Sequence, residues 1–196
     1  NHRAAVLGTL GTGFPGALIQ TGYTTPDAPR LQTQLKELRD AGAQQLAIEI
    51  SSHALDQDRV AGLNVRSAVF TNLTQDHLDY HGTMETYGLA KASLFRSPGL
   101  RHAVLNLDDD FSTVLREVIA TDVEVLTYSI SNPLADVYTH SERYHATGVS
   151  AAISTPWGDG LLISPLLGDF NLSNLLAAVT CLCSSGADLS EVLGAT

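Results

Sequence analysis

The sequence has little cysteine and no long apolar run, and both shortages limit the class of protein that it can encode. Only two of its 196 residues are cysteines, Cys181 and Cys183. Two thiols one residue apart in a predicted helix are a poor geometry for a disulfide and only half of a zinc site. We therefore expect both to be small core side chains. No stretch approaches the roughly 20 consecutive apolar residues of a membrane helix, so no membrane insertion is expected.

Basic side chains are scarce as well. The chain has 11 Lys and Arg residues against 21 Asp and Glu residues, which gives a formal net charge of −10. A nucleic-acid-binding surface needs basic patches, so no nucleic-acid partner is expected. Anionic small substrates stay compatible with this charge, because a few well-placed cations or a metal ion can reverse the local field. The length suffices for one sizeable domain with a real core.

The start of the chain lacks an initiator Met and a signal-peptide pattern. We expect a piece excised from a longer protein. An acidic chain with no targeting signal fits a cytoplasmic location.

A phosphate-binding loop ending in Gly-Lys-Ser or Gly-Lys-Thr is also missing. The segment 8–16 is rich in glycine, but it has no such ending and no helix directly after it. We predict a flexible crossover there.

Apolar strand-like runs alternate with helical patterns over the first two thirds of the chain. The predicted strands are 4–10, 46–50, 66–71, 102–107 and 123–128, and the predicted helices are 28–41, 83–96 with Thr83 as its N-cap, and 109–120. This alternation indicates βαβ units, and hence an α/β fold with a mostly parallel sheet flanked by helices.

The pattern changes after Pro133. Short alternating segments surround a turn-rich stretch at 155–160, which is typical of a hairpin. We predict a small antiparallel sheet over about 134–167, a helix over 171–185, and a last short helix capped by Asp188. Residues 1–196 are thus expected to form one α/β domain with an antiparallel extension.

Polar clusters follow three of the predicted strands, at 49–53, 71–81 and 106–110. Open parallel sheets bind ligands beyond the carboxyl ends of their strands. We therefore expect a site at one edge of the sheet. Alone, Glu49 is either a metal ligand or a capping acceptor, and His77 is a ligand, a general base or a hydrogen-bonded loop histidine. Together they suit a Mg²⁺ site that substrate phosphate and water complete.

Lys91 is unusual in its predicted helix. It shares one helical face with Met84, Tyr87 and Leu94, the face that we expect to lie on the sheet. A lysine there can extend to solvent along an apolar surface. It can also bind a ligand or, with a depressed pKa, react with CO₂ to give a carbamate whose oxygens bind metal.

Five segments together resemble the Mur ligases, and within that family the members that add the third residue of the peptidoglycan stem peptide. They occur in the family's order and spacing and cover nearly the whole chain. The segments are TTPDA (24–28), EISSHALDQDRV (49–60), FTNLTQDHLDYHGTMETYGLAKASLF (70–95), LNLDDD (105–110) and GDFNLSNLLAA (168–178).

The resemblance implies the ATP-binding central domain of a three-domain ligase, with a P-loop-NTPase-like fold. In that family ATP phosphorylates a carboxylate of the substrate, and the amine of an incoming amino acid attacks the acyl phosphate. The implied substrates are UDP-MurNAc-L-Ala-D-Glu and a diamino acid, either meso-diaminopimelate or L-lysine. The family's phosphate loop is expected to precede Asn1, so the isolated chain is expected to be inactive.

The resemblance also implies roles for single residues. Lys91, which is carbamylated in the family, and His77 are implied to be catalytic, and with Glu49 they form the Mg²⁺ site. The implied substrate contacts are Thr24, Thr25, Ser51, Gln57 and Arg59, and the implied ATP contacts are Asn72, Asn171 and Asn174. Asp108 and Asp109 are weaker matches.

The chain departs from the family at two positions beside the substrate contacts. Tyr23 stands where the family usually has Asn, and Pro26 follows the threonine pair. Two alternatives stay open, a non-catalytic binding domain with a degenerate ligase fold and a ligase similar to folylpolyglutamate synthase.

Overall fold

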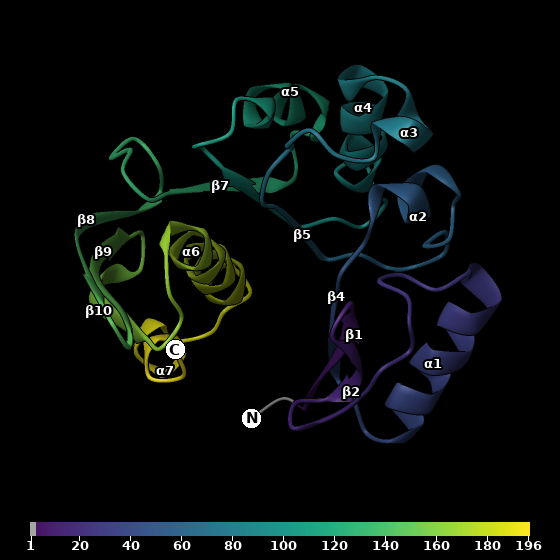
Figure 1. Ribbon diagram of the computed structural model, residues 1–196, viewed down its shortest axis with the longest axis horizontal. Helices are drawn as coiled ribbons and strands as arrows, with labels where there is room; N and C mark the ends of the chain where they lie inside the picture. The colour runs from purple at the N-terminus through teal and green to yellow at the C-terminus, as the bar shows by residue number, and fades with distance from the viewer. Residues whose placement is uncertain (1–2) are drawn as a thin grey trace. The chain divides into compact units, whose positions relative to one another are not determined.

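The structure, a computed structural model, describes residues 3–196 (Figure 1). The chain divides into two compact units. The first unit comprises Asn1–Leu63 and His77–Leu94, and the second comprises Asn64–Asp76 and Phe95–Thr196. Each unit has its own sheet and is described by itself.

The first unit contains a four-stranded mixed sheet. Its strands are β1 (Ala4–Gly8), β2 (Gly11–Phe14), β3 (Ala17–Ile19) and β4 (Gln45–Ile48), in the order β3-β2-β1-β4. Strands β1 and β4 are parallel, whereas β1, β2 and β3 form an antiparallel meander.

The predicted flexible crossover at 8–16 is wrong, because β2 and β3 form a paired hairpin there. Gly13 has a φ of 146°, and a Cβ at this position would lie 2.6 Å from the carbonyl oxygen of Ala17. Glycine thus permits the close pairing of these two strands. The glycines that suggested mobility instead allow an extended backbone.

Four helices complete the first unit: α1 (Ala28–Asp40), α2 (Ser52–Asp56), α3 (Leu78–His81) and α4 (Met84–Leu94). The side chain of Asp27 caps α1 by accepting from the amide of Arg30 at 3.0 Å. Thr83 caps α4 as predicted, since its Oγ1 accepts from the amide of Thr86 at 3.2 Å. Helix α4 packs against α2 and α3, with Tyr87 buried.

The second unit contains a six-stranded sheet in the order β10-β9-β8-β7-β6-β5. Its strands are β5 (Ser67–Phe70), β6 (His102–Asn106), β7 (Glu124–Ser129), β8 (Val137–His145), β9 (Gly148–Thr155) and β10 (Gly158–Ser164). Strands β5 to β8 pair in parallel, and β8 to β10 form an antiparallel meander.

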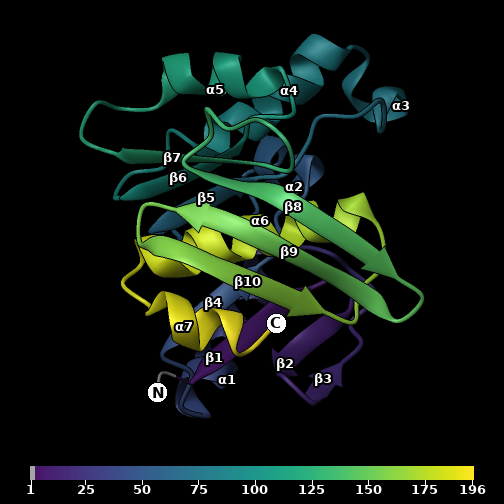
Figure 2. The same cartoon turned by 90° about the vertical axis from the view of Figure 1, so that its left-hand side faces the viewer.

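Three helices belong to this second unit: α5 (Phe111–Val118), α6 (Asp169–Ser184) and α7 (Leu189–Leu193). Figure 2 shows α6 behind the three long strands β8 to β10, and α7 beside β10. Asp188 caps α7 as predicted, because its Oδ1 accepts from the amide of Ser190 at 2.9 Å. Its pKa lies below the usual value of an aspartic acid, mainly through the hydrogen bond from the Ser190 hydroxyl.

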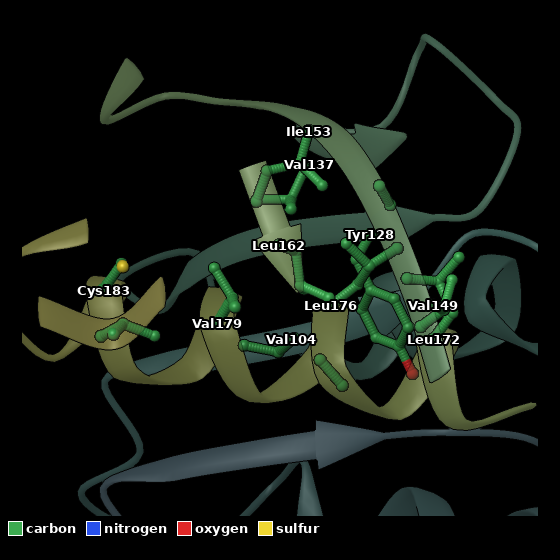
Figure 3. Packing of buried hydrophobic residues seen from close by; sticks show 13 residues of the cluster. Val104, Tyr128, Val137, Val149, Ile153, Leu162, Leu172, Leu176, Val179 and Cys183 are labelled. Carbon is green, nitrogen blue, oxygen red and sulfur yellow. The ribbon is translucent and has the colours of Figure 1, made fainter. Parts of the chain in front are cut away.

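The core of the second unit lies between α6 and the sheet (Figure 3). Leu172, Leu176 and Val179 of α6 are fully buried and pack with Tyr128 of β7 and other apolar side chains of the strands. Burial of these side chains is the main source of stability for this layer.

Cys183 belongs to the same cluster and Cys181 packs against it, and both thiols are free. The sequence-based expectation that the two cysteines are core side chains is therefore confirmed.

One topological expectation is wrong. The three polar clusters were expected at one edge of a single sheet, but β4 pairs with β1 whereas β5 and β6 pair with each other in the second sheet. The physical reason is that β1 supplies the parallel hydrogen-bonded neighbour of β4, with α1 in the crossover between them. Glu49 therefore follows one sheet, and Asn72 and Asn106 lie at the strand ends of the other.

Within the described part of the chain, no helix combines the length and the apolar character that a membrane crossing requires.

Candidate functional site

Glu49, the residue directly after β4, is held in place through both its backbone and its side chain. Its amide donates to the carbonyl oxygen of Leu7 at 2.8 Å, and its carbonyl oxygen accepts from the Thr25 hydroxyl at 2.9 Å. Carboxylate oxygen Oε2 accepts two hydrogen bonds from Thr9, from the amide and from Oγ1, each at 2.9 Å. Such charge-assisted bonds give the carboxylate a defined direction.

Thr25 connects Glu49 with the start of α2. It is 2% exposed, and its Oγ1 both donates to the carbonyl oxygen of Glu49 and accepts from the amide of Ser51 at 3.1 Å. Ser51 in turn caps α2, since its Oγ accepts from the amide of Ala54 at 3.2 Å. The one proton of the buried Thr25 hydroxyl is therefore committed to Glu49, and in this network Thr25 holds the segment that leads into α2.

Gln57 and Arg59 form a second linked pair just after α2. The Oε1 of Gln57 accepts from Arg59 Nε at 2.9 Å and from Nη2 at 2.6 Å. Arg59 Nη1 donates to the carbonyl oxygen of Thr25 at 2.9 Å. These contacts fix the orientation of the guanidinium. Because Gln57 is neutral, it does not compensate the positive charge of Arg59.

Tyr80, on α3, extends this network. Its hydroxyl donates to Asp56 Oδ2 at 2.8 Å and accepts from Gln57 Nε2 at 2.9 Å. The five residues implied as substrate contacts therefore lie in one unit. Four of them are linked by hydrogen bonds, because Thr25 bonds to Ser51 and to Arg59, and Arg59 bonds to Gln57.

His77 precedes α3 with a left-handed backbone, φ 55° and ψ 23°. Few non-glycine residues adopt this conformation, and it sets the direction in which the chain enters α3. The ring of His77 makes an edge contact with that of His53, at 4.8 Å between centroids, and lies 6.0 Å from the Tyr87 ring.

Histidine and tyrosine rings gather around His53. Its ring lies 4.1 Å from Tyr80 and 5.4 Å from His81, and His81 Nε2 is 2.9 Å from the hydroxyl of Ser52. Partial burial, followed by the charges of His77 and His81, lowers the pKa of His53 below the usual histidine value. The cluster therefore disfavours the protonated form of the His53 ring.

Lys91 lies on α4 and is partly buried. Its Nζ lies 5.1 Å from the centroid of the Tyr87 ring, within the range of a cation–π contact.

The predicted helical face of α4 is only partly confirmed. Tyr87 is buried, but Met84 and Leu94 are half-buried, and the other buried positions are Gly88 and Ala92. The reason is that α4 packs on the small helix α2 rather than along a flat surface of this unit's sheet.

Glu49 and His77 carry an oxygen and a nitrogen donor, both of which are kinds of group that bind divalent cations. Oε2 of Glu49 is bonded to Thr9, and the Glu49 side chain is exposed, so a cation can reach the carboxylate. A Cβ on Gly8 would lie 2.9 Å from Oε2, so glycine leaves the space that the carboxylate fills. No three His, Cys, Asp or Glu side chains within 3–196 are grouped to hold a metal, so further ligands such as a carbamate or phosphate oxygen are required.

The three residues implied as ATP contacts belong to the second unit. Asn171 sits in the first turn of α6, and its side-chain amide donates to the carbonyl oxygen of Leu167 at 2.8 Å. Asn174 is half-buried one turn later on the same helix, and Asn72 follows β5. Asn171 and Asn174 are three residues apart and so share one face at the start of α6.

Asp108 and Asp109 bind backbone groups. Asp109 Oδ2 accepts from the amide of Leu73 at 2.7 Å, and Oδ1 accepts from that of Phe111 at 2.9 Å. Asp108 accepts from the amide of Ile130 at 2.9 Å and from the Ser129 hydroxyl. Both carboxylates hold loops at the ends of β5, β6 and β7, next to an open cavity of about 530 Å³ that Leu73 and Phe111 also line.

Sequence analysis did not single out Thr9, His53 or Tyr80 as site residues. Thr9 lies in the glycine-rich segment that was dismissed, and its contact with Glu49 spans 40 positions in the sequence. Only a three-dimensional arrangement could reveal that contact. Tyr80 and His53 lie inside the segments that carry the family resemblance. Their position in those segments is the signal by which the sequence could have identified them as site residues.

The fold and this network define an α/β domain that holds a carboxylate, an imidazole, an amine and a fixed arginine in one unit. Residues 1–182 match the family model described as "Mur ligase middle domain". The chain belongs to this family.

Proteins similar to this chain carry more specific names. One, from Pseudomonas aeruginosa, is 53% identical over 192 residues, which cover 98% of this chain and 39% of the relative, and is named UDP-N-acetylmuramoyl-L-alanyl-D-glutamate–2,6-diaminopimelate ligase. A solved structure of a ligase of that name matches with a TM-score of 0.92 at 38% identity, over 98% of this chain and 40% of that chain. The chain thus spans about two fifths of the length of these relatives.

A more distant solved structure, MurF ligase from Thermotoga maritima in complex with ADP, has a TM-score of 0.64 at 19% identity and covers 96% of this chain and 42% of that chain. At this identity the likeness shows the fold alone. The expected α/β class and the resemblance to the Mur ligases are both confirmed by these comparisons.

Proposed function

We propose that residues 1–196 are the ATP-binding central domain of a MurE-type ligase, which joins a diamino acid to UDP-MurNAc-L-Ala-D-Glu in the synthesis of peptidoglycan precursors. The observation that carries the proposal is the hydrogen-bond network of the first unit. This network joins the matched substrate positions Thr25, Ser51, Gln57 and Arg59 with Glu49. The names of the similar proteins favour diaminopimelate as the amino acid.

In this proposal the reaction has two steps. A carboxylate oxygen of the substrate attacks the γ-phosphorus of ATP and expels ADP, which forms an acyl phosphate. The amine of diaminopimelate then attacks the acyl carbon, loses a proton, and expels inorganic phosphate as the amide forms. Both steps bring anionic groups together, and Mg²⁺, when bound, supplies the positive charge that stabilises them.

Residues of this chain have separate roles in the proposal. Arg59, fixed by Gln57 and by the carbonyl oxygen of Thr25, offers its charge to the anionic substrate. Glu49 and His77, with Lys91 as a carbamate, hold the cation. Thr24 and Ser51 contact the UDP-linked substrate, and Asn72, Asn171 and Asn174 contact ATP. A UDP-linked precursor is made in the cytoplasm, which supports that location for the protein.

A ligation assay with the full-length gene product tests the proposal. The assay supplies ATP, Mg²⁺, UDP-MurNAc-L-Ala-D-Glu and either meso-diaminopimelate or L-lysine, and measures ADP release together with product mass. We expect turnover with meso-diaminopimelate and far less with L-lysine.

Isotope transfer tests the chemistry separately. With ¹⁸O in the reacting substrate carboxylate, one labelled oxygen should appear in the inorganic phosphate, because the carboxylate oxygen stays on phosphorus when the amide forms. Absence of ADP release with both amino acids would overturn the proposed function, and unlabelled phosphate would overturn the acyl-phosphate step.

A further inference from the structure

Thr9 stands between two residues of the proposed site. Its Oγ1 lies 2.9 Å from Glu49 Oε2 and 2.8 Å from the Oγ1 of Thr24. Its amide donates to the same Glu49 oxygen at 2.9 Å. Thr9 follows β1, Thr24 follows β3, and Glu49 follows β4, so this one residue joins three separate segments of the first unit.

The direction of these hydrogen bonds follows from the donors available. A hydroxyl has one proton, and an ionised carboxylate only accepts. The proton of Thr9 Oγ1 therefore goes to Glu49, since a charge-assisted bond is stronger than a neutral one. The hydroxyl of Thr24 then has to donate to Thr9. The chain of donation runs from Thr24 through Thr9 to the carboxylate.

We propose that Thr9 is a positioning residue, which directs the carboxylate of Glu49 toward the cation and couples it to the substrate contact at Thr24. This inference rests on the proposed function for the roles of Glu49 and Thr24. Partners that orient a metal ligand tune its affinity for the ion even though they do not touch it. Here Thr9 binds Oε2 through both its amide and its hydroxyl, and the carboxylate is otherwise exposed to solvent.

The surroundings of the carboxylate support this assignment. The carboxylate lies over Gly8, where a Cβ would be 2.9 Å from Oε2, so the backbone closes that side. The backbone of Glu49 is held independently by Leu7 and Thr25. Loss of the Thr9 hydroxyl should therefore leave the carboxylate with the Thr9 amide alone and loosen its orientation without moving the main chain. Thr24, whose proton is committed to Thr9, can then contact the substrate only as a hydrogen-bond acceptor.

Manganese binding by the full-length protein tests the inference without turnover. Free Mn²⁺ is measured by electron paramagnetic resonance, with a non-hydrolysable ATP analogue and UDP-MurNAc-L-Ala-D-Glu present. We expect Thr9→Val to raise the Kd of Mn²⁺ about 10-fold, a loss typical of a partner that orients a ligand. Thr9→Ser keeps the hydroxyl and should stay within about twofold of wild type.

Two controls separate positioning from a general loss of structure. Thr33→Val makes the same chemical change on α1, where the hydroxyl donates to the carbonyl oxygen of Pro29 within the same helix, and should leave the Kd unchanged. In a Glu49→Gln background, Thr9→Val should weaken Mn²⁺ binding by less than about twofold, because both changes act on one interaction.

Coupling to the substrate gives another readout. In the wild type, UDP-MurNAc-L-Ala-D-Glu should tighten Mn²⁺ binding, and Thr9→Val should abolish this difference. The inference is overturned if Thr9→Val binds Mn²⁺ as the wild type does, if Thr9→Ser is as weak as Thr9→Val, or if Thr9→Val has its full effect in the Glu49→Gln background. A wild type that shows the Thr9-dependent Mn²⁺ binding but no ligation would overturn the proposed function alone.

Discussion

Arg59 donates two hydrogen bonds to one oxygen of Gln57, from Nε at 2.9 Å and from Nη2 at 2.6 Å. A neutral amide thus fixes the guanidinium in a place where a carboxylate would cancel its charge. The same glutamine donates through its Nε2 to the hydroxyl of Tyr80, which ties the pair to α3. The arginine is therefore oriented but stays cationic, as a site for anionic groups requires.

Gln57→Glu tests this arrangement. The new carboxylate should keep both hydrogen bonds from Arg59 and neutralise its charge, although it loses the bond that Gln57 donates to Tyr80, so the KM for UDP-MurNAc-L-Ala-D-Glu should rise about 10-fold. Steady-state kinetics of the full-length enzyme gives the answer. Gln32→Glu makes the same charge change at an exposed position of α1 and should have no effect on KM. An unchanged KM in Gln57→Glu would remove Arg59 from substrate binding.

Lys91→Ala tests the proposed carbamate. If the carbamate oxygens complete the cation site, this change should lower kcat about 100-fold or more, and added bicarbonate should not restore it, since the amine is gone. Lys36→Ala, which removes an exposed lysine paired with Asp40, serves as the matched control. Near-normal turnover in Lys91→Ala would refute the role.

Asp109→Ala tests the structural role of that carboxylate in the second unit. The change leaves the amides of Leu73 and Phe111 without their acceptor, so the free energy of unfolding should fall by about 1–3 kcal/mol. Asp110 precedes α5 but makes no capping hydrogen bond with its side chain, so Asp110→Ala should change stability by less than about 0.5 kcal/mol. Urea unfolding of both variants distinguishes them, and equal stabilities would contradict the role of Asp109.

The two cysteines should react slowly with thiol reagents in the native protein. Burial raises the pKa of both thiols, and the charge of Asp188 adds to this for Cys183. Because the thiolate is the reactive form, a raised pKa lowers the reactive fraction at any pH below it. At pH 8 we expect alkylation at least about 10-fold slower than in urea, with the native rate still rising above pH 9. Equal rates in the two states would show that the thiols are accessible.

Much of the fold could be predicted from local sequence patterns. The caps at Thr83 and Asp188 and the alternation of strands and helices depend on residues close together in the chain, and they appear as expected. The short helices α2 and α3 were missed because four or five residues carry too little periodicity to be recognised, whereas the equally short α7 was predicted from its Asp188 cap. The hairpin of β2 and β3 was missed because its glycines are also typical of loops.

The candidate site, like the fold, has some features that the sequence determines and others that it does not. The sequence alone determined which residues carry the family's pattern, because that pattern depends on the order and spacing of residues along the chain. Among them are Glu49, His77, Lys91 and Arg59. Only the tertiary structure decided that the strand before Glu49 pairs with β1 and that Thr9, 40 positions earlier, holds its carboxylate. Hydrogen bonds between distant segments depend on how strands pair, and strand pairing is settled by contacts across the whole unit rather than by any local run of residues.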